Sequence, residues 1–137
     1  MGTVSEILSK FAAQLRFEDL SEEVRHKTKQ MILDTLGCAL GGYLSEPSRI
    51  TRSVIRDLGG KPESTIIGSG DRTSCPYAAL ANCVMVRYLD FMDIYFNVDT
   101  SHPSENIPTA LAVGEKEHSS GKEIITAIVI GFEIQGR

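Results

Sequence analysis

Apolar residues recur three or four positions apart in six successive stretches of this chain, and this pattern constrains the fold more than any other feature. The spacing is that of one face of an α-helix. It predicts helices over residues 4–15, 21–44, 48–58, 74–93, 106–118 and from 122 onward. One excursion near residues 64–74, centred on G-S-G-D, predicts a short extended hairpin or loop. No β-α-β alternation occurs, so the predicted fold class is mainly α.

The helix starts are predicted from residues that can cap free backbone N–H groups. Ser48 and Ser74 are expected to cap the helices that follow them. Ahead of the helix that contains Pro108, either Ser104 or Asn106 can be the cap. Asn106 is preferred, because Pro108 then falls in the first turn, where a missing N–H costs little.

The second half of the longest predicted helix carries the run L-G-C-A-L-G-G-Y-L at 36–44, which has no polar face. A helix that is apolar all round is expected to be buried. Gly37 and Gly41 lie four positions apart and would let another helix approach closely, at up to ~1 kcal/mol each in helix propensity. Tight core packing is the favoured interpretation. Dimerisation through this segment is the alternative.

The charge balance argues against several classes of partner. The net charge is −4 and no Lys/Arg cluster occurs, so neither a nucleic-acid surface nor a polybasic membrane anchor is expected. The longest uncharged segment, residues 35–45, is far shorter than the ~20 residues of a membrane span. Three cysteines without metal-type spacing, and no signal-peptide core, predict a soluble cytoplasmic protein with free thiols.

Residues 88–115 hold the densest set of chemically active side chains, between hydrophobic helix-like segments. Seventeen positions contain Asp90, Asp93, Asp99, His102, Ser104, Glu105 and Asn106. Asp90 and Asp93 are predicted to lie on neighbouring turns of one helix, with Arg87 on the same side. A solvated acidic face with an Arg87–Asp90 ion pair is the alternative interpretation, and the pattern alone favours it.

His102 precedes Pro103, and a residue before proline is kept out of the α region. It is therefore predicted in extended backbone just ahead of a helix, where free N–H groups favour an anion. A lone histidine at a helix start is more often a cap or a surface residue, so the neighbouring carboxylates are what favour a functional role. No His-x-x-x-His or Cys-x-x-Cys spacing occurs, so no metal site is expected, and no cysteine is placed as a nucleophile.

Two motifs of this region, L-D-F-M-D at 89–93 and H-P-S-E-N-I-P at 102–108, resemble the signature of the MmgE/PrpD family. M-I-L-D-T-L-G-C at 31–38, A-A-L-A-N at 78–82 and G-F-E-I-Q-G-R at 131–137 extend the likeness over essentially the whole chain. The family includes 2-methylcitrate dehydratase, cis-aconitate decarboxylase and iminodisuccinate epimerase. The resemblance implies that residues 1–137 are part of its all-helical domain, with its smaller α/β domain absent from this sequence.

The resemblance also implies an active site, in which Asp90 and His102 are catalytic. It assigns substrate contacts to Asp93, Ser104, Asn106 and Arg87. Ile94 stands where the family often has threonine, which removes a hydroxyl from the site. The resemblance implies a lyase that acts on a small polycarboxylate, such as a dehydratase of 2-methylcitrate or citrate in propionate metabolism. The implied mechanism is general acid/base catalysis, without a metal or a cofactor.

The family's later histidine and lysine site residues have no counterpart in residues 1–137, so turnover by this chain alone is not expected. The positive groups that bind the substrate are expected to come mostly from the missing part of the family fold. The expected protein partner is a second copy, as in a homodimer, or a complementing C-terminal part. Two other hypotheses stay open. One is a non-catalytic helical module with a structural or dimerisation role, and the other is a metal-dependent hydrolase that uses Asp90, Asp93 and His102.

Overall fold

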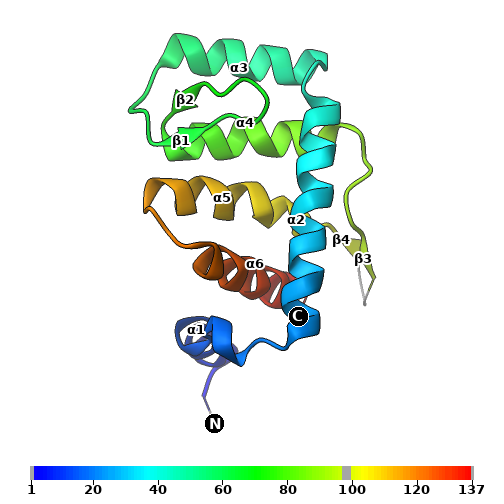
Figure 1. The fold of residues 1–137 in the computed structure, drawn as a ribbon, viewed down its shortest axis with the longest axis vertical. Coiled ribbons are helices and arrows are strands. Elements are labelled where there is room, and N and C mark those ends of the chain that lie inside the picture. The colour runs from blue at the N-terminus through cyan, green and yellow to red at the C-terminus, as the bar shows by residue number, and fades with distance from the viewer. Residues whose placement is uncertain (1, 97–99, 137) are drawn as a thin grey trace.

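The computed structural model describes residues 2–96 and 100–136, and six α-helices account for most of that part (Figure 1). The helices are α1 (Val4–Gln14), α2 (Glu22–Gly42), α3 (Glu46–Leu58), α4 (Cys75–Tyr88), α5 (Asn106–Lys116) and α6 (Gly121–Gln135). Short 3-10 helices cover Phe17–Asp19 and Pro103–Glu105. The predicted fold class, mainly α, is confirmed.

Two small antiparallel hairpins interrupt the helices. In the first, β1 (Ser64–Thr65) pairs with β2 (Arg72–Thr73), which confirms the hairpin predicted near residues 64–74. In the second, β3 (Tyr95–Phe96) pairs with β4 (Thr100–Ser101) inside the α4–α5 connection. This second hairpin was not predicted, because each of its strands has only two residues and its segment shows no alternating pattern.

The helices form a stack with α2 along one edge. α3, α4, α5 and α6 lie across the length of α2, one below another in the view of Figure 1. Neighbours in this stack pack on each other, and α2 packs on both α4 and α6. The main core lies between α2, α3 and α4, and its buried members include Ala39, Ile55, Met85 and Val86. The α4–α5 connection, which holds the candidate site, therefore leaves the stack next to α2.

The closest approach between α2 and α4 occurs at Gly42. A Cβ atom built on this glycine would lie 2.2 Å from the carbonyl oxygen of Met85, so no larger residue fits there. Met85 and Ala39 are both fully buried beside this contact. Close packing was predicted at Gly37 and Gly41. Gly41 lies close to the Leu89 side chain, where an added Cβ would be 2.6 Å from its Cδ1, whereas the backbone contact is made by Gly42 and Gly37 makes none.

The outer face of α2 contradicts the prediction that its second half is buried all round. Leu33 and Leu40 are 73% and 58% exposed, and Leu44, in the turn that follows the helix, is 77% exposed. At Gly37, an added Cβ would meet no atom within 4 Å. The run 36–44 is apolar on both sides of the helix, but only one side faces α4, so the other side remains open.

Three predicted helix boundaries are wrong. Ser45, not Ser48, caps α3, because Ser48 is buried and its hydroxyl donates to the carbonyl of Gly42 at 2.8 Å. Asn106 is the first residue of α5 and has helical dihedral angles, so it is not a cap. The end of α4 at Tyr88, short of the predicted position 93, bears directly on the candidate site.

In the described part of the chain, no helix is both long enough and apolar enough to cross a lipid bilayer. Cys38, Cys75 and Cys83 are free thiols, as predicted.

Candidate active site

A sharp turn at Asp90 ends α4 and begins the candidate site. Asp90 has a φ of +55°, in the left-handed region that aspartate tolerates better than most residues. The chain therefore leaves the helix at Leu89, and Met92 then packs into the main core. Asp90 and Asp93 do not share a helix face, so that prediction is wrong.

Arg87 connects the end of α4 to the start of the next helical segment. Its Nη1 donates a hydrogen bond to Oδ1 of Asp90, and its Nε lies 3.2 Å from Oε1 of Glu105. The hydrogen bond from Arg87 holds the pKa of Asp90 below its ordinary value, and the charge of Arg87 adds to this effect. The predicted Arg87–Asp90 ion pair is present, and the single guanidinium is shared by two of the protein's own carboxylates.

The Arg87–Asp90 ion pair leads to a prediction about the pKa of Asp90. Replacing Arg87 with glutamine should raise the pKa of Asp90 toward the ordinary aspartate value of about 3.9, because the ionised form loses a hydrogen bond and a neighbouring positive charge. The titration of the side-chain carboxyl carbon in an NMR spectrum measures this. Arg72→Gln is the control, since Arg72 pairs with Glu115 instead. If the pKa of Asp90 is the same in the unmodified chain, in Arg87→Gln and in Arg72→Gln, the ion pair does not persist in solution.

His102 is half-buried and lies in non-helical backbone, with φ −119° and ψ 78°, just before the 3-10 helix. Its Nδ1 is 2.7 Å from the backbone carbonyl oxygen of Asp93. A carbonyl oxygen can only accept, so Nδ1 must carry the hydrogen. In the neutral ring this leaves the lone pair on Nε2, the nitrogen that could then take a proton.

Asp93 accepts two hydrogen bonds, one from His102 and one from Ser104. Its backbone carbonyl accepts from His102, and its Oδ1 accepts from the backbone N–H of Ser104 at 3.0 Å. The carboxylate thus satisfies a free N–H at the start of a helical segment, where a negative charge is favoured. Asp93 therefore fixes the position of the His102 ring relative to the following helix.

Asp90 and His102 lie close enough for their charges to interact. A positive charge on His102 contributes to the low pKa of Asp90, although Arg87 contributes more. Each side chain is held by a different group: Asp90 by Arg87, and His102 by the Asp93 carbonyl. Asp99, the remaining carboxylate of this region, lies outside the described residues.

Ser104 lies in the 3-10 helix Pro103–Glu105, and Asn106 is the first residue of α5. Ser104 is completely buried, and among the described residues its hydroxyl has no hydrogen-bond partner. The amide nitrogen of Asn106 donates to the carbonyl of Pro103 at 3.0 Å and to Oε1 of Gln135 at 2.5 Å. Asn106 thereby joins the start of α5 to the end of α6. Substrate contacts by these two residues stay a prediction.

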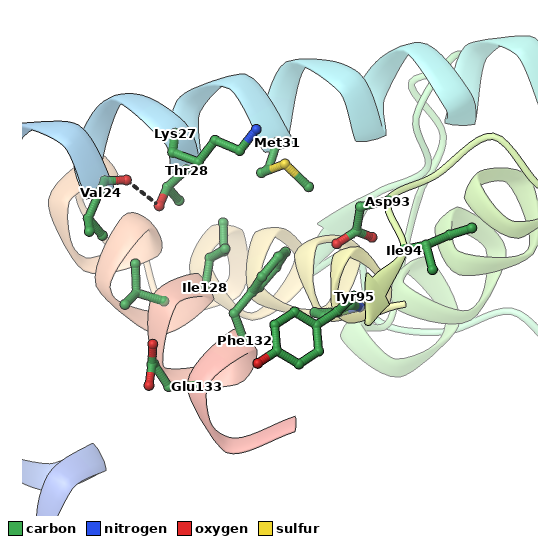
Figure 2. A pocket seen from close by; sticks show the side chains of 12 residues that line it. Val24, Lys27, Thr28, Met31, Asp93, Ile94, Tyr95, Ile128, Phe132 and Glu133 are labelled. Carbon is green, nitrogen blue, oxygen red and sulfur yellow. Dashed lines mark hydrogen bonds between the residues drawn. The ribbon is translucent and has the colours of Figure 1, made fainter. Parts of the chain in front are cut away.

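A hollow of about 390 Å³ lies beside the site, between α2, α6 and the α4–α5 connection (Figure 2). Its described lining includes Asp93 and Pro103 but neither Asp90 nor His102. Most of the lining is apolar: Val24, Met31, Ile94, Ile128, Val129 and Phe132. The size suits a small molecule, whereas the surface is less polar than a polycarboxylate alone would require.

Lys27 is a cation near the site that sequence reasoning missed. It lies on α2 and lines the same hollow as Asp93, and Figure 2 shows it on the α2 side of that hollow. No motif marks it, and more than sixty residues separate it from Asp93. Only the packing of α2 beside the α4–α5 connection brings the two together.

The described part of the chain offers little support for a nucleophilic cysteine or for a bound metal ion as the catalytic group. Burial raises the pKa of the Cys83 thiol, which reduces the fraction present as the reactive thiolate. Its Sγ lies 3.6 Å from the carbonyl oxygen of Glu105. Among residues 2–96 and 100–136, no three His, Cys, Asp or Glu side chains gather as they would around a metal ion. A metal-free site stays a prediction, as does the absence of a cofactor.

A sequence profile of the MmgE/PrpD N-terminal domain matches residues 6–137, which include the Asp90 turn, His102 and the whole helical stack except its first residues. The chain belongs to the MmgE/PrpD family. The resemblance of the L-D-F-M-D and H-P-S-E-N-I-P motifs to this family is thereby confirmed.

Named MmgE/PrpD relatives match along most of this chain. Cis-aconitate decarboxylase of Homo sapiens is 30% identical over 143 residues, which cover 100% of this chain and 29% of that protein. The 2-methylcitrate dehydratase of Escherichia coli (strain K12) is 29% identical over 136 residues, covering 86% of this chain and 27% of that protein. The chain thus spans less than a third of the length of these relatives.

Proposed function

We propose that this chain contributes the His102 and Asp90 part of a lyase site that acts on a small polycarboxylate by general acid/base catalysis. The observation that carries the proposal is the hydrogen bond from Nδ1 of His102 to the Asp93 carbonyl, because it leaves Nε2 as the basic nitrogen. Support comes from the relatives named cis-aconitate decarboxylase and 2-methylcitrate dehydratase.

In the proposed reaction, Nε2 of His102 takes a proton from the carbon next to a substrate carboxylate. In a dehydration, the bonding electrons form the new double bond as hydroxide leaves, protonated by a general acid. Histidine suits the first step because its charge changes near neutral pH. Asp90 stays ionised beside Arg87, and its negative charge stabilises the imidazolium that forms.

The proposed substrate carries several negative charges, and this part of the chain offers few positive ones. Arg87 is shared between Asp90 and Glu105, while Lys27 lies across the hollow on α2. Groups that hold the substrate carboxylates and stabilise the transition state therefore have to come from elsewhere. We propose that they belong to the part of the family fold outside residues 1–137, including its smaller α/β domain, so that turnover requires that part.

The chain's three histidines allow a direct test. In a protein that joins this chain to the rest of the family fold, titration with 2-methylcitrate or citrate, followed by NMR of the histidine ring protons, should shift the His102 signals and leave those of His26 and His118 in place. His26 lies on α2 and His118 after the end of α5, and neither lines the hollow beside Asp93. Acetate at the same ionic strength is the control ligand. Equal shifts of all three histidines, or none at His102, would refute a polycarboxylate site at this position.

A non-catalytic helical module is the second candidate function. The observation that favours it is the amount of exposed apolar surface, which includes Leu33, Leu44, Phe91 and Phe96. Such surface is typical of a face that contacts another protein. The same titration separates the two candidates, since the module predicts no response of His102 to any polycarboxylate.

A further inference from the structure

A second hollow lies between α3 and the first hairpin. Its volume is about 230 Å³, and three arginines line it: Arg52 and Arg56 from α3, and Arg72 from β2. None of its described lining residues also lines the hollow beside Asp93. In Figure 1 the hairpin is drawn next to α3, at the far end of the stack from α6. We call this second hollow the arginine hollow.

The arginine hollow concentrates positive charge in a protein whose net charge is −4. Asp71 is the one carboxylate among its described lining residues. Arg52 and Arg56 are four positions apart, so they are neighbours on one face of α3. Like charges at this spacing repel each other and slightly destabilise a helix. A bound anion would offset this repulsion.

Arg52 and Arg72 are held in place by the chain and still have N–H groups to donate. Nη1 of Arg52 donates to the carbonyl oxygen of Tyr43 at 2.8 Å, and its guanidinium carbon lies 3.9 Å from the centre of the Tyr43 ring. Nη2 of Arg72 donates to the carbonyl oxygen of Glu63 at 3.0 Å and lies 3.6 Å from Oε1 of Glu115. A guanidinium has five N–H donors. Nε and the second Nη of each arginine therefore have no hydrogen-bond partner among the described residues.

Arg56 is held less firmly than the other two arginines. Its Nη2 lies 3.8 Å from Oδ2 of Asp71, and the two side chains are 72% and 56% exposed. An ion pair as long and as exposed as this one contributes little to stability. The guanidinium of Arg56 can therefore turn from Asp71 toward a ligand.

The floor of the arginine hollow is apolar. Ile55 and Ile66 line it, and they are only 3% and 2% exposed. A cleft that combines walls of low dielectric constant with charges of one sign focuses the electric field and attracts counter-ions. The floor thus strengthens the attraction that the three guanidinium groups exert on an anion.

We propose that the arginine hollow binds a phosphate dianion, either free or as the phosphate group of a small monoester. Three guanidinium groups from two elements can contact oxygens that point in different directions, which suits tetrahedral phosphate better than one planar carboxylate. A water molecule takes up about 30 Å³ in the liquid, so the hollow has room for a phosphate group and a few further atoms. The proposal does not depend on the proposed catalytic function.

Two features of the arginine hollow oppose anion binding. Asp71 lies on its rim, and the C-terminal end of α3, which carries partial negative charge, reaches it at Gly59. The rim is also open to solvent, where salt screens the charges. We therefore expect a dissociation constant in the millimolar range, which rises with the concentration of sodium chloride.

An NMR titration of the ¹⁵N-labelled chain with inorganic phosphate tests the proposal. Sodium chloride keeps the ionic strength constant, and a slightly alkaline pH keeps phosphate mainly in the dianionic form. The backbone amides of Gly59, Gly60 and Thr73, which line the hollow, should shift along a saturating curve, whereas those of α6 should not. Shifts that do not saturate, or that are equal along the whole chain, overturn the proposal.

Three substitutions test which charges bind the phosphate. Arg56→Gln should weaken binding roughly tenfold, because it removes one of the three guanidinium groups. Arg49→Gln is the matched control, since Arg49 is exposed on the same helix but does not line the hollow, and it should weaken binding by about twofold at most. Asp71→Asn should tighten binding severalfold, because it removes the opposing carboxylate. A loss of folding cannot produce such a gain. Equal weakening by the two arginine variants, or no gain in Asp71→Asn, overturns the proposal.

Two further ligands identify the chemistry that the arginine hollow prefers. Glycerol 3-phosphate separates the two sources of the phosphate group: tighter binding than inorganic phosphate assigns a monoester, and weaker binding assigns free phosphate. Succinate carries the same charge on two planar carboxylates. If succinate binds more tightly than either phosphate ligand, the assignment of the hollow to phosphate is wrong.

Discussion

If the proposed lyase function is correct, His102→Ala should lower the catalytic rate of the chain joined to the rest of the family fold by about 10²–10⁴-fold, the usual contribution of a positioned general acid or base. The free energy of unfolding should change by only about 1 kcal/mol, because the ring is half-buried and makes one hydrogen bond to a carbonyl. The rate is measured by the ultraviolet absorbance of the conjugated double bond that dehydration of 2-methylcitrate creates.

Two further variants separate proton transfer from positioning. Asparagine at 102 keeps a donor for the Asp93 carbonyl but has no basic nitrogen, so it should be as inactive as alanine. His118→Ala is the control and should retain the full rate, since His118 is exposed beyond the end of α5. Substantial activity in either His102 variant would mean that another group moves the proton.

Alanine at Gly42 is expected to destabilise the fold by about 1–3 kcal/mol. The new methyl group would lie 2.2 Å from the carbonyl oxygen of Met85, in the last turn of α4, and a backbone atom of a packed helix cannot move aside as a side chain can. Overpacking of this kind typically costs ~1–3 kcal/mol or somewhat more, against a gain of up to ~1 kcal/mol in helix propensity. Urea denaturation followed by circular dichroism measures the net effect.

Gly37→Ala is the matched control in the same helix. It makes the same chemical change, but its methyl group meets no atom within 4 Å, so only the helix propensity changes. We expect it to stabilise the chain by about 0.5–1 kcal/mol. If the two substitutions had the same effect, α2 and α4 would not approach each other as closely as described.

The sequence predicts the helices better than it predicts their ends. Periodicity finds all six helices, because a buried apolar face leaves a repeating pattern whatever the tertiary contacts are. The end of α4 depends on one left-handed residue, Asp90, which a local pattern does not distinguish from a helical aspartate. The misplaced cap at Ser48 has a similar cause, since its hydroxyl is used in a contact with Gly42.

Some features of the candidate site were predictable from the sequence, and others were not. The motif around His102 identified a residue that the structure holds by a defined hydrogen bond, and Arg87 pairs with Asp90 as the three-residue spacing suggests. The catalytic and substrate-binding roles stay predictions. Lys27 and the apolar hollow were not predictable, because both arise where α2 and α6 meet the α4–α5 connection. Periodicity also does not distinguish a face of α2 that packs within the chain from one that is open.

The turn at Asp90 has a consequence for how this protein can vary in evolution. Asp90 directs its carboxylate toward Arg87, and the next residue, Phe91, lines a hollow on the outer side of α2 together with Gly37 and Cys38. A mutation that reshapes the turn would alter the Asp90–Arg87 ion pair and the surface beside α2 together. We therefore expect substitutions at 90 and 91 to be inherited in combination with changes on the outer side of α2, rather than to drift independently.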